Sequence, residues 1–305
     1  MKFDIVCLGE PLYEFSQIPG RPREYLQGFG GDTMNCAIAA ARQGARVSYV
    51  TRLGDDEFGR QLRQMWSEEG IDTSGVEIDP ESHTAVYFIS HGPAGHAFSY
   101  LRKGSAASRM RPDFLPQALL RSTAFFQTSG ISQAISDSAC DTVFAAIDLA
   151  KAAGARFVYD ANIRPRLWSK ARAAAVVGAT VALADFFFLS IEDAQLLCGL
   201  TETDAVLDWC HRRGARCVVF KLGPAGAVAS DGRVRWTIPG YRVQAVDATG
   251  AGDCFAGAAM ARLAAGDSIE AALRYASAAA ALTCTGFGAV GSLPRPGAVR
   301  ALMNG

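Results

Sequence analysis

The chain has 305 residues and a mass of 32.3 kDa, which suits one large α/β domain with a sizeable core and an accessory element. Hydrophobic residues make up 50% and charged residues 20%, which excludes a collagen-like or disordered chain. Thirty basic side chains balance thirty acidic ones, so net charge gives no support for binding nucleic acid or a membrane surface. We therefore expect any anion site to be local.

The eight cysteines include no Cys-x-x-Cys pair, and several lie inside apolar runs. They indicate reduced core thiols in a reducing compartment. The first ten residues carry Asp4 and Glu10, which leave too short an apolar stretch for a signal peptide. The longest uncharged stretch, residues 275–294, is interrupted by three glycines and does not favour a membrane span. The sequence predicts a cytoplasmic protein.

Short apolar runs alternate with helix-like segments along most of the chain. This rhythm is typical of βαβ units around a mainly parallel sheet, whose ligands bind at the carboxyl ends of the strands. Two amphipathic stretches, residues 58–68 and 139–153, end at glycines that fit helix C-termini. The predicted strands are residues 5–8, 47–50, 124–127, 157–159, 186–189 and 218–220.

Residues 84–102 break this rhythm and predict a β-hairpin. Strands at 84–90 and 96–102 would be joined by the Gly/Pro turn at 91–95. Side chains alternate along a strand, so Phe98, Tyr100 and Arg102 would share one face. Such a face suits a lid over a small polar anion; an ordinary surface hairpin with an exposed arginine is the alternative.

The strongest local signal is residues 246–257, which lead into a helical segment at 258–265. The three small residues Gly250, Ala251 and Gly252 leave backbone N–H groups free to bind an anion at a helix start. Asp253 falls in the first helical turn, where its carboxylate would accept the proton of a hydroxyl that attacks a phosphoryl group. The alternative is a glycine-rich turn in which Asp253 only complements the helix dipole.

Other glycine and catalytic motifs are absent from the sequence. A dinucleotide fingerprint would need glycine at position 255, where Phe255 stands. No Gly-Lys pair occurs, so there is no Walker A loop, and the protein-kinase motifs are missing. None of the four histidines has the spacing of a zinc protease or lies near a Gly-x-Ser-x-Gly elbow. These gaps exclude a Rossmann oxidoreductase, a zincin and an α/β-hydrolase.

A second glycine cluster lies at residues 28–35, before a helical segment at 36–42. Gly30 and Gly31 would let a ligand approach the backbone, while Asp32 or Thr33 caps the helix and Asn35 faces the same mouth. A plain capped helix after a glycine turn is the alternative.

Taken together, Gly30-Gly31 with Asn35, residues 54–59 and residues 247–253 resemble the two signatures of the ribokinase-like (PfkB-type) sugar kinases. The resemblance implies one domain over residues 1–305, a three-layer α/β fold with a mainly parallel central sheet, and a small β-sheet lid. The lid strands would come from about residues 11–28 and 84–103. The resemblance also implies ATP as phosphoryl donor, Mg²⁺, and phosphorylation of a hydroxymethyl group.

Residues 9–12, 100–108, 129–131 and 160–168 look like the 2-keto-3-deoxygluconate kinase group of this family. That substrate carries a carboxylate, which Arg102 and Arg164 would bind through charge-assisted hydrogen bonds. A kinase of a neutral sugar such as fructose or ribose, or of a related keto acid, stays open. So does a non-catalytic sugar sensor on the same fold.

The resemblance also assigns roles to single residues. Asp253 would be the base, with Gly250, Ala251 and Gly252 as the anion hole, and the sugar would be held by Gly31, Asn35, Tyr87, Tyr100, Arg102 and Arg164. The nucleotide would contact Ser190, Lys221, Gly223, Gly226, Thr249, Gly250, Ala251, Gly252 and Ser277. A solvated charge at a strand end is the alternative for Lys221. Asp193 or Glu192 would order the waters of Mg²⁺, with no ligand assigned firmly, and pairing of lid hairpins would give a homodimer.

Overall fold

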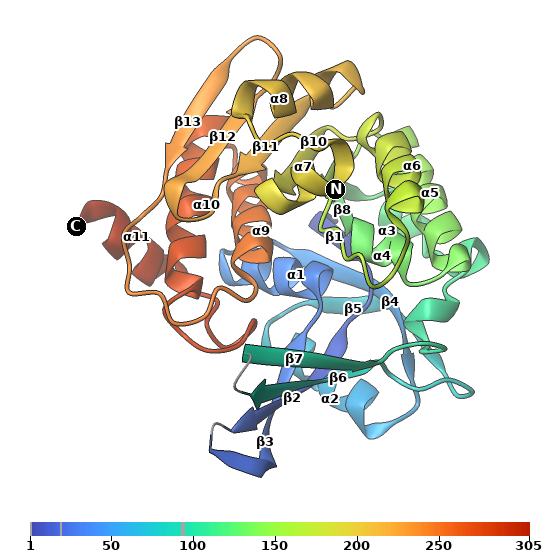
Figure 1. The fold of residues 1–305 in the computed structure, drawn as a ribbon. Coiled ribbons are helices and arrows are strands. Elements are labelled where there is room, and N and C mark those ends of the chain that lie inside the picture. The colour runs from blue at the N-terminus through green and yellow to red at the C-terminus, as the bar shows by residue number, and fades with distance from the viewer. Residues whose placement is uncertain (1, 19, 93–94) are drawn as a thin grey trace.

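The computed structural model describes residues 2–18, 20–92 and 95–305 (Figure 1). Its strands are β1 (Phe3–Leu8), β2 (Leu12–Ile18), β3 (Arg21–Gly30), β4 (Val47–Gly54), β5 (Asp72–Asp79), β6 (Val86–Gly92), β7 (Gly95–Leu101), β8 (Thr123–Ser129), β9 (Arg156–Asp160), β10 (Phe186–Ser190), β11 (Cys217–Lys221), β12 (Gly226–Ser230) and β13 (Arg235–Pro239).

The α-helices are α1 (Asp32–Arg42), α2 (Glu57–Glu68), α3 (Gln117–Leu120), α4 (Gly130–Ala134), α5 (Asp137–Ala152), α6 (Lys170–Val181), α7 (Ile191–Cys198), α8 (Thr203–Arg212), α9 (Ala251–Ala264), α10 (Ile269–Thr283) and α11 (Pro296–Asn304). The 3₁₀ turns are η1 (Ala107–Arg109), η2 (Pro112–Phe114) and η3 (Gly223–Ala225).

Within the described residues the larger sheet has nine strands in the order β13-β12-β11-β10-β9-β8-β1-β4-β5. All neighbours from β5 to β11 run parallel, and only β12 and β13 are antiparallel at one edge. All six predicted strands lie in this sheet, which confirms the βα interpretation. The parallel order brings the carboxyl ends of β1, β8, β9, β10 and β11 to one edge, where ligands of such sheets bind.

Helices cover both faces of the large sheet (Figure 1). One core cluster packs α1, α2, α9 and α10 against one face, and the other packs α5, α6, α7 and α8 against the opposite face. The predicted three-layer ribokinase-like fold is confirmed. Among the described residues no helix has both the length and the apolar content needed to cross a membrane, and all eight cysteines are free thiols.

A second sheet has the order β3-β2-β6-β7 in the described part of the chain and lies below the large sheet in Figure 1. We call it the lid sheet. Its strands β6 and β7 form the predicted hairpin, although positions 93–94 of the predicted turn lie outside the described residues. The ring of Tyr100 stacks on Phe98 at 6.3 Å and lies under the Arg102 guanidinium, so these three side chains share a face as predicted.

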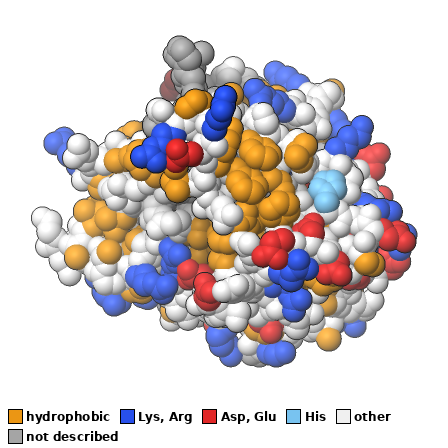
Figure 2. Space-filling view, turned by 90° about the horizontal axis from the view of Figure 1, so that it is seen from below, with side chains coloured by type: hydrophobic (Ala, Val, Ile, Leu, Met, Phe, Trp, Pro, Cys, Tyr) orange, Lys and Arg blue, Asp and Glu red, His pale blue; other side chains and the backbone are white. Residues whose placement is uncertain are grey.

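The lid sheet exposes large apolar side chains. Figure 2, viewed from below, shows a broad hydrophobic area on this side of the molecule. The lid residues with large exposed apolar side chains are Tyr25, Leu26, Phe98, Tyr100 and Leu101.

Helix α1 begins earlier than predicted. Gly31 occupies its N-cap with φ 118°, and the helix starts at Asp32 with no side-chain cap. The prediction that Asp32 or Thr33 caps the helix is therefore wrong. The reason is steric, because a Cβ at position 31 would lie 2.5 Å from the Glu10 carbonyl oxygen, and only glycine can adopt this backbone conformation so close to the β1–β2 connection. The Asp32 carboxylate instead accepts hydrogen bonds from the Thr33 amide and from the Asn162 side chain.

Candidate active site

Helices α1 and α9 bring together two predicted site residues that lie far apart in the chain. Asn35 Nδ2 donates to Asp253 Oδ2 over 2.8 Å. Asp253 lies in the first turn of α9, as predicted. The two helices can approach because position 257 is glycine, where a Cβ would stand 2.3 Å from the Cys36 carbonyl oxygen. Helix packing thus sets the orientation of the Asp253 carboxylate.

Asp253 lies among other acidic groups. Its burial, together with the charges of Asp32 and Asp160, raises the pKa of the Asp253 carboxyl to about 8, against an ordinary value of 3.8. The Asn35 hydrogen bond and the Lys221 charge act in the opposite direction and do not compensate. A carboxyl with a pKa near neutrality suits general base catalysis, because it accepts a proton readily and still ionises at working pH.

Lys221 brings a positive charge to the same place. Its Nζ lies 2.6 Å from Asp160 Oδ2, and both side chains are largely buried. A Cβ placed on Gly252 would stand 3.2 Å from this Nζ, so the ammonium lies beside the start of α9. Burial lowers the pKa of Lys221, but the carboxylates of Asp160 and Asp193 outweigh burial and raise it. The ammonium therefore stays charged next to the amides of the predicted anion hole.

The carboxylate of Asp247 fixes the turn before α9 through hydrogen bonds. Asp247 Oδ1 accepts hydrogen bonds from the Thr249 amide and hydroxyl at 2.9 and 2.6 Å, and Asp247 Oδ2 accepts one from the Gly288 amide at 3.0 Å. Gly250 is the N-cap of α9 with φ 78°, a conformation that favours glycine. No side chain caps α9, and the Ala251 amide donates to the Ala248 carbonyl over 3.2 Å, which leaves the neighbouring amides of Gly250 and Gly252 to bind an anion.

On the predicted nucleotide side, Ser190 and Asp193 form a capping box at the start of α7. Asp193 Oδ2 accepts from the Ser190 amide and hydroxyl, and Asp193 Oδ1 accepts from the Ile163 amide at 2.8 Å. Both oxygens of Asp193 are thus engaged, whereas Glu192 is exposed. Among the described residues there is no group of three metal-ligating side chains, so the protein itself offers no metal cage here.

The other predicted nucleotide residues lie near the ends of β11 and β13. Gly223 and Gly226 flank the short η3 turn with φ 59° and 100°. A Cβ at Gly226 would lie 2.1 Å from the Ile238 carbonyl oxygen, so this glycine is needed for packing as well. The Ser277 hydroxyl donates to the Pro239 carbonyl over 2.8 Å, which ties α10 to β13.

The lid sheet contributes a buried pair that sequence reasoning found only in part. The Tyr87 hydroxyl donates to Glu14 Oε2, and the Tyr87 ring stacks on Tyr100 at 5.7 Å. Burial raises the pKa of the Glu14 carboxyl, and Asp247 adds to the effect. The sequence analysis missed Glu14, although a carboxylate in the strand directly after the Gly9-Glu10-Pro11 turn could have drawn attention to it.

Arg102 has a partner that was not predicted. Its Nη2 donates to Glu10 Oε2, and Glu10 Oε1 accepts from the Ser105 hydroxyl at 2.8 Å. Arg164 is exposed in the loop after β9, where it bonds the carbonyl of its neighbour Ile163. In the same loop Arg166 Nη1 lies 3.5 Å from the Phe98 carbonyl of β7, so this loop and the lid sheet meet. The loop that carries Arg164 and Arg166 therefore lies beside the lid sheet, which leads into Arg102.

Three buried polar atoms of these residues have no hydrogen-bond partner among the described residues. They are Asn35 Oδ1, Arg102 Nε and Asp160 Oδ1. Each unpaired buried polar atom costs on the order of 1–3 kcal/mol. Such a cost is typical of a site whose polar groups are satisfied by a ligand.

Comparisons with known proteins agree with this arrangement. The model of the pfkB family of carbohydrate kinases matches residues 2–296. The chain is 35% identical over 301 residues to a 2-dehydro-3-deoxygluconokinase of Thermoproteus tenax, covering 96% of this chain and 91% of the relative. It is 33% identical to fructokinase-1 of Oryza sativa subsp. japonica, covering 98% and 97%.

A solved structure of a fructokinase with bound ATP from Xylella fastidiosa superposes with a TM-score of 0.92 at 28% identity, covering 100% of this chain and 99% of that one. The family match and the fold define a phosphotransferase with an alcohol group as acceptor. The chain belongs to the pfkB family of carbohydrate kinases. It is a sugar kinase.

Proposed function

We propose that this sugar kinase acts on 2-keto-3-deoxygluconate and forms 2-keto-3-deoxy-6-phosphogluconate inside the cytoplasm. The observation that carries the proposal is that Arg102, directly after β7, and the loop that carries Arg164 belong to two segments in contact, since Arg166 of that loop reaches the Phe98 carbonyl of β7. Guanidinium groups bind carboxylates through paired, charge-assisted hydrogen bonds, which a neutral sugar does not require. The similarity to the Thermoproteus tenax enzyme supports the same substrate.

In the proposed mechanism, the sugar lies between the lid sheet and Asp253, with Gly31, Asn35, Tyr87 and Tyr100 around it. The Asp253 carboxylate accepts the proton of the terminal hydroxyl, whose oxygen attacks the γ-phosphorus of ATP in line with the leaving oxygen. The bond from the γ-phosphorus to the bridging oxygen breaks, and ADP leaves. Lys221 and the amides of Gly250 and Gly252 stabilise the charge that develops on the phosphoryl oxygens.

ATP would lie along the ends of β10 and β11. It would be bordered by Ser190, Gly223, Gly226 and Thr249, and Ser277 would lie beneath it. Mg²⁺ fits this site as an ion held by phosphate oxygens and water, because the two oxygens of Asp193 are engaged and no protein cage exists among the described residues. When bound, the ion would neutralise phosphate charge. Glu192, exposed at the start of α7, would order its waters.

A neutral-sugar kinase, acting on fructose, is the second candidate, and two observations favour it. The charge of Arg102 is already balanced by Glu10, and the acidic side chains of Glu14 and Asp32 are better suited to sugar hydroxyls than to a carboxylate. The rice fructokinase is nearly as similar as the archaeal enzyme.

The test is ADP release with ATP and Mg²⁺ on 2-keto-3-deoxygluconate, 2-keto-3-deoxygalactonate, 2-ketogluconate, fructose, ribose and adenosine. The proposal expects a preference for the first two substrates. Arg164→Ala, which changes an exposed side chain, should raise KM for the keto acid about tenfold and leave kcat within about twofold. Arg23→Ala, on an exposed arginine of β3, is the matched control and should change neither.

Preference for fructose or ribose would replace the substrate assignment and keep Asp253 in its role. Full keto-acid activity in both Arg102→Ala and Arg164→Ala would contradict the carboxylate assignment. Binding of a sugar without turnover of any substrate would favour a non-catalytic sensor.

A further inference from the structure

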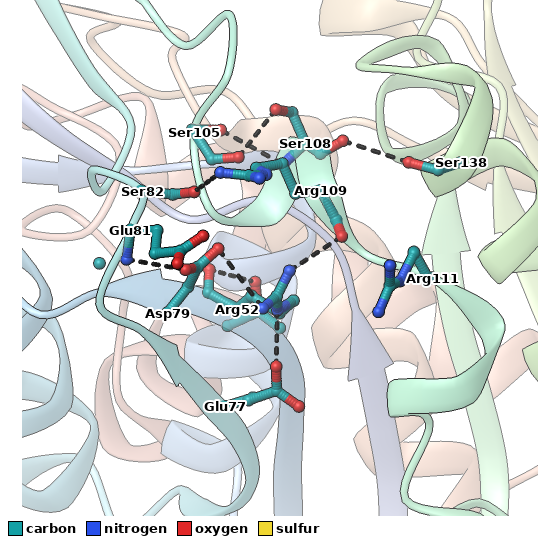
Figure 3. Close-up of polar contacts among 12 residues, drawn as sticks. Arg52, Glu77, Asp79, Glu81, Ser82, Ser105, Ser108, Arg109, Arg111 and Ser138 are labelled. Atoms are coloured by element: carbon teal, nitrogen blue, oxygen red, sulfur yellow. Dashed lines mark hydrogen bonds and ion pairs between the residues drawn. The ribbon is translucent and has the colours of Figure 1, made fainter.

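A second pocket lies outside the kinase site. It has a volume of about 370 Å³ and lies at the ends of β4 and β5, between η1 and the start of α5 (Figure 3). None of its lining residues belongs to the site around Asp253. The lining residues are Arg52, Asp79, Glu81, Ser108, Arg109, Arg111 and Ser138.

Arg52 lines this pocket, and its guanidinium is fully engaged with neighbouring residues. Its guanidinium lies 2.8 Å from Glu77 Oε1 and 3.4 Å from Asp79 Oδ2, and it donates to the Arg109 carbonyl over 2.9 Å. Two carboxylates therefore balance its charge. Arg52 fixes the backbone of Arg109 and leaves the binding of a ligand to other groups.

Arg109 and Arg111 supply the available positive charge. Arg109 Nη1 donates to the neutral hydroxyl of Ser82 at 2.7 Å, and Figure 3 shows this side chain beside Ser108. Arg111 pairs with Asp113 at 3.3 Å, but both side chains are about 70% exposed. An ion pair that is so exposed contributes little free energy, so Arg111 can readily exchange Asp113 for another anion. Among the described residues Arg109 has no carboxylate within ion-pair distance, although its charge helps to lower the pKa of Asp79, and Arg111 can leave its exposed partner, so both guanidinium groups can bind an anion.

The start of α5 closes the other side. Ser136 caps the helix and Ser138 lies in its first turn, where the backbone amides have no partner inside the helix. The hydroxyls of both serines also lie within 2.6 and 3.4 Å of the Ser108 carbonyl, so α5 and η1 form one wall. Ser138 therefore brings the positive end of a sixteen-residue helix to a pocket that already holds two arginines, and its hydroxyl, whose bond to the Ser108 carbonyl is long at 3.4 Å, can turn to a ligand.

We propose that this pocket binds the phosphate ester of a small polyol or sugar. Arg109 and Arg111 would bind the phosphate together with Ser138, because guanidinium groups match phosphate oxygens in pairs. The exposed carboxylate of Glu81 would accept hydrogen bonds from the hydroxyl groups of the polyol. Two acidic residues in the lining disfavour a nucleoside triphosphate or a tricarboxylate, and the volume exceeds what a free phosphate ion fills.

The pocket is connected to the lid sheet through one short segment. The Ser108 hydroxyl donates to the Ser105 carbonyl at 2.8 Å, and the Ser105 hydroxyl donates to Glu10, the partner of Arg102. A ligand on Arg109 would therefore order residues 102–111. This gives a second observable, slower hydrogen exchange of those amides in the presence of the ligand.

The test is calorimetric titration of the full chain with glycerol 3-phosphate, with glycerol and inorganic phosphate as matched probes. We expect a Kd on the order of 1 mM or tighter for the ester and no measurable binding of glycerol. Arg109→Ala and Arg111→Ala should each weaken binding about tenfold. Arg121→Ala, an exposed arginine bonded only to Gln117, is the control and should bind normally.

Binding should persist in Asp253→Asn saturated with a non-hydrolysable ATP analogue, because the pocket is separate from the kinase site. Loss of binding there would place the ester in the kinase site and overturn the proposal. Equal affinity for inorganic phosphate would overturn the choice of an ester. Absence of binding, or binding unchanged in both arginine variants, would overturn the pocket itself. None of these outcomes depends on which sugar the kinase phosphorylates.

Discussion

Asn35 and Asp253, from helices at opposite ends of the chain, are joined by a hydrogen bond of 2.8 Å. The amide of Asn35 holds one carboxylate oxygen of Asp253 and leaves the other to accept a proton. The same bond favours the ionised form, yet burial and the nearby Asp32 and Asp160 keep the pKa of Asp253 near 8.

The pH dependence of kcat/KM should report the ionisation of Asp253. A base must be deprotonated to act, so kcat/KM should rise with pH and level off above about pH 8 in the free enzyme. Removing the negative charge of Asp32 makes ionisation of Asp253 easier. In Asp32→Asn the rising limb should therefore shift to lower pH, by about one unit. Initial rates in buffers from about pH 5 to about pH 9 measure both profiles.

An exposed carboxylate far from the site provides the control for this experiment. Asp204→Asn, at the start of α8, should leave the limb in place. A limb that stays unmoved in Asp32→Asn would mean that a different group controls the rate.

Asp253→Asn should lower kcat by about a hundredfold or more and also stabilise the fold. The folded-state pKa of about 8 lies above the ordinary value of 3.8, so the folded chain keeps a proton that the unfolded chain releases between these values. Wild-type stability therefore falls as pH rises from about 4 to about 8, and the variant lacks this loss. Thermal unfolding should show a variant Tm about 2–5 °C higher at pH 8 and nearly equal at pH 4. A Tm difference independent of pH would contradict the raised pKa.

Gly257→Ala tests whether helix packing positions the base. The new Cβ would stand 2.3 Å from the Cys36 carbonyl oxygen, so α9 must move away from α1. We expect a loss of about 1–3 kcal/mol in the free energy of unfolding and a lower kcat, because Asn35 and Asp253 separate. Denaturant unfolding and initial rates measure the two effects. Gly178→Ala, a helical glycine of α6 with open space around it, is the control and should lower neither.

The layers of the fold could be predicted because each strand is a short apolar run with a helix behind it. The six predicted strands all lie in the large sheet, and the hairpin at residues 84–102 was found from its turn and its alternation. The start of α1 could not be predicted from the sequence, because it depends on the contact of Gly31 with the Glu10 backbone, which is distant in sequence. Propensity favours Asp or Thr as a cap and contains no information on that contact.

The candidate site, like the fold, has some features that the sequence predicts and others that it does not. Asp253 and the residues of the anion hole were predicted because they are adjacent in sequence and begin a helix. The ion-pair partners of the charged residues could not be predicted from the sequence. The pairs Glu10–Arg102 and Asp160–Lys221 form only when separate strands and loops come together in the fold. These pairs determine how much charge a ligand meets. A motif therefore locates the chemistry, whereas the strength of the electrostatic field depends on the tertiary structure.

The Asp160–Lys221 pair gives the last prediction, a double-mutant cycle that separates its structural role from its catalytic one. Lys221→Met leaves Asp160 buried without a counter-charge, so the free energy of unfolding should fall by about 3 kcal/mol. Adding Asp160→Asn removes the stranded charge and should recover most of that stability. Turnover should stay about a hundredfold low in both variants, because neither has an ammonium beside Gly252 to stabilise the transferring phosphoryl group. Recovery of turnover together with stability would instead make Lys221 a purely structural partner of Asp160.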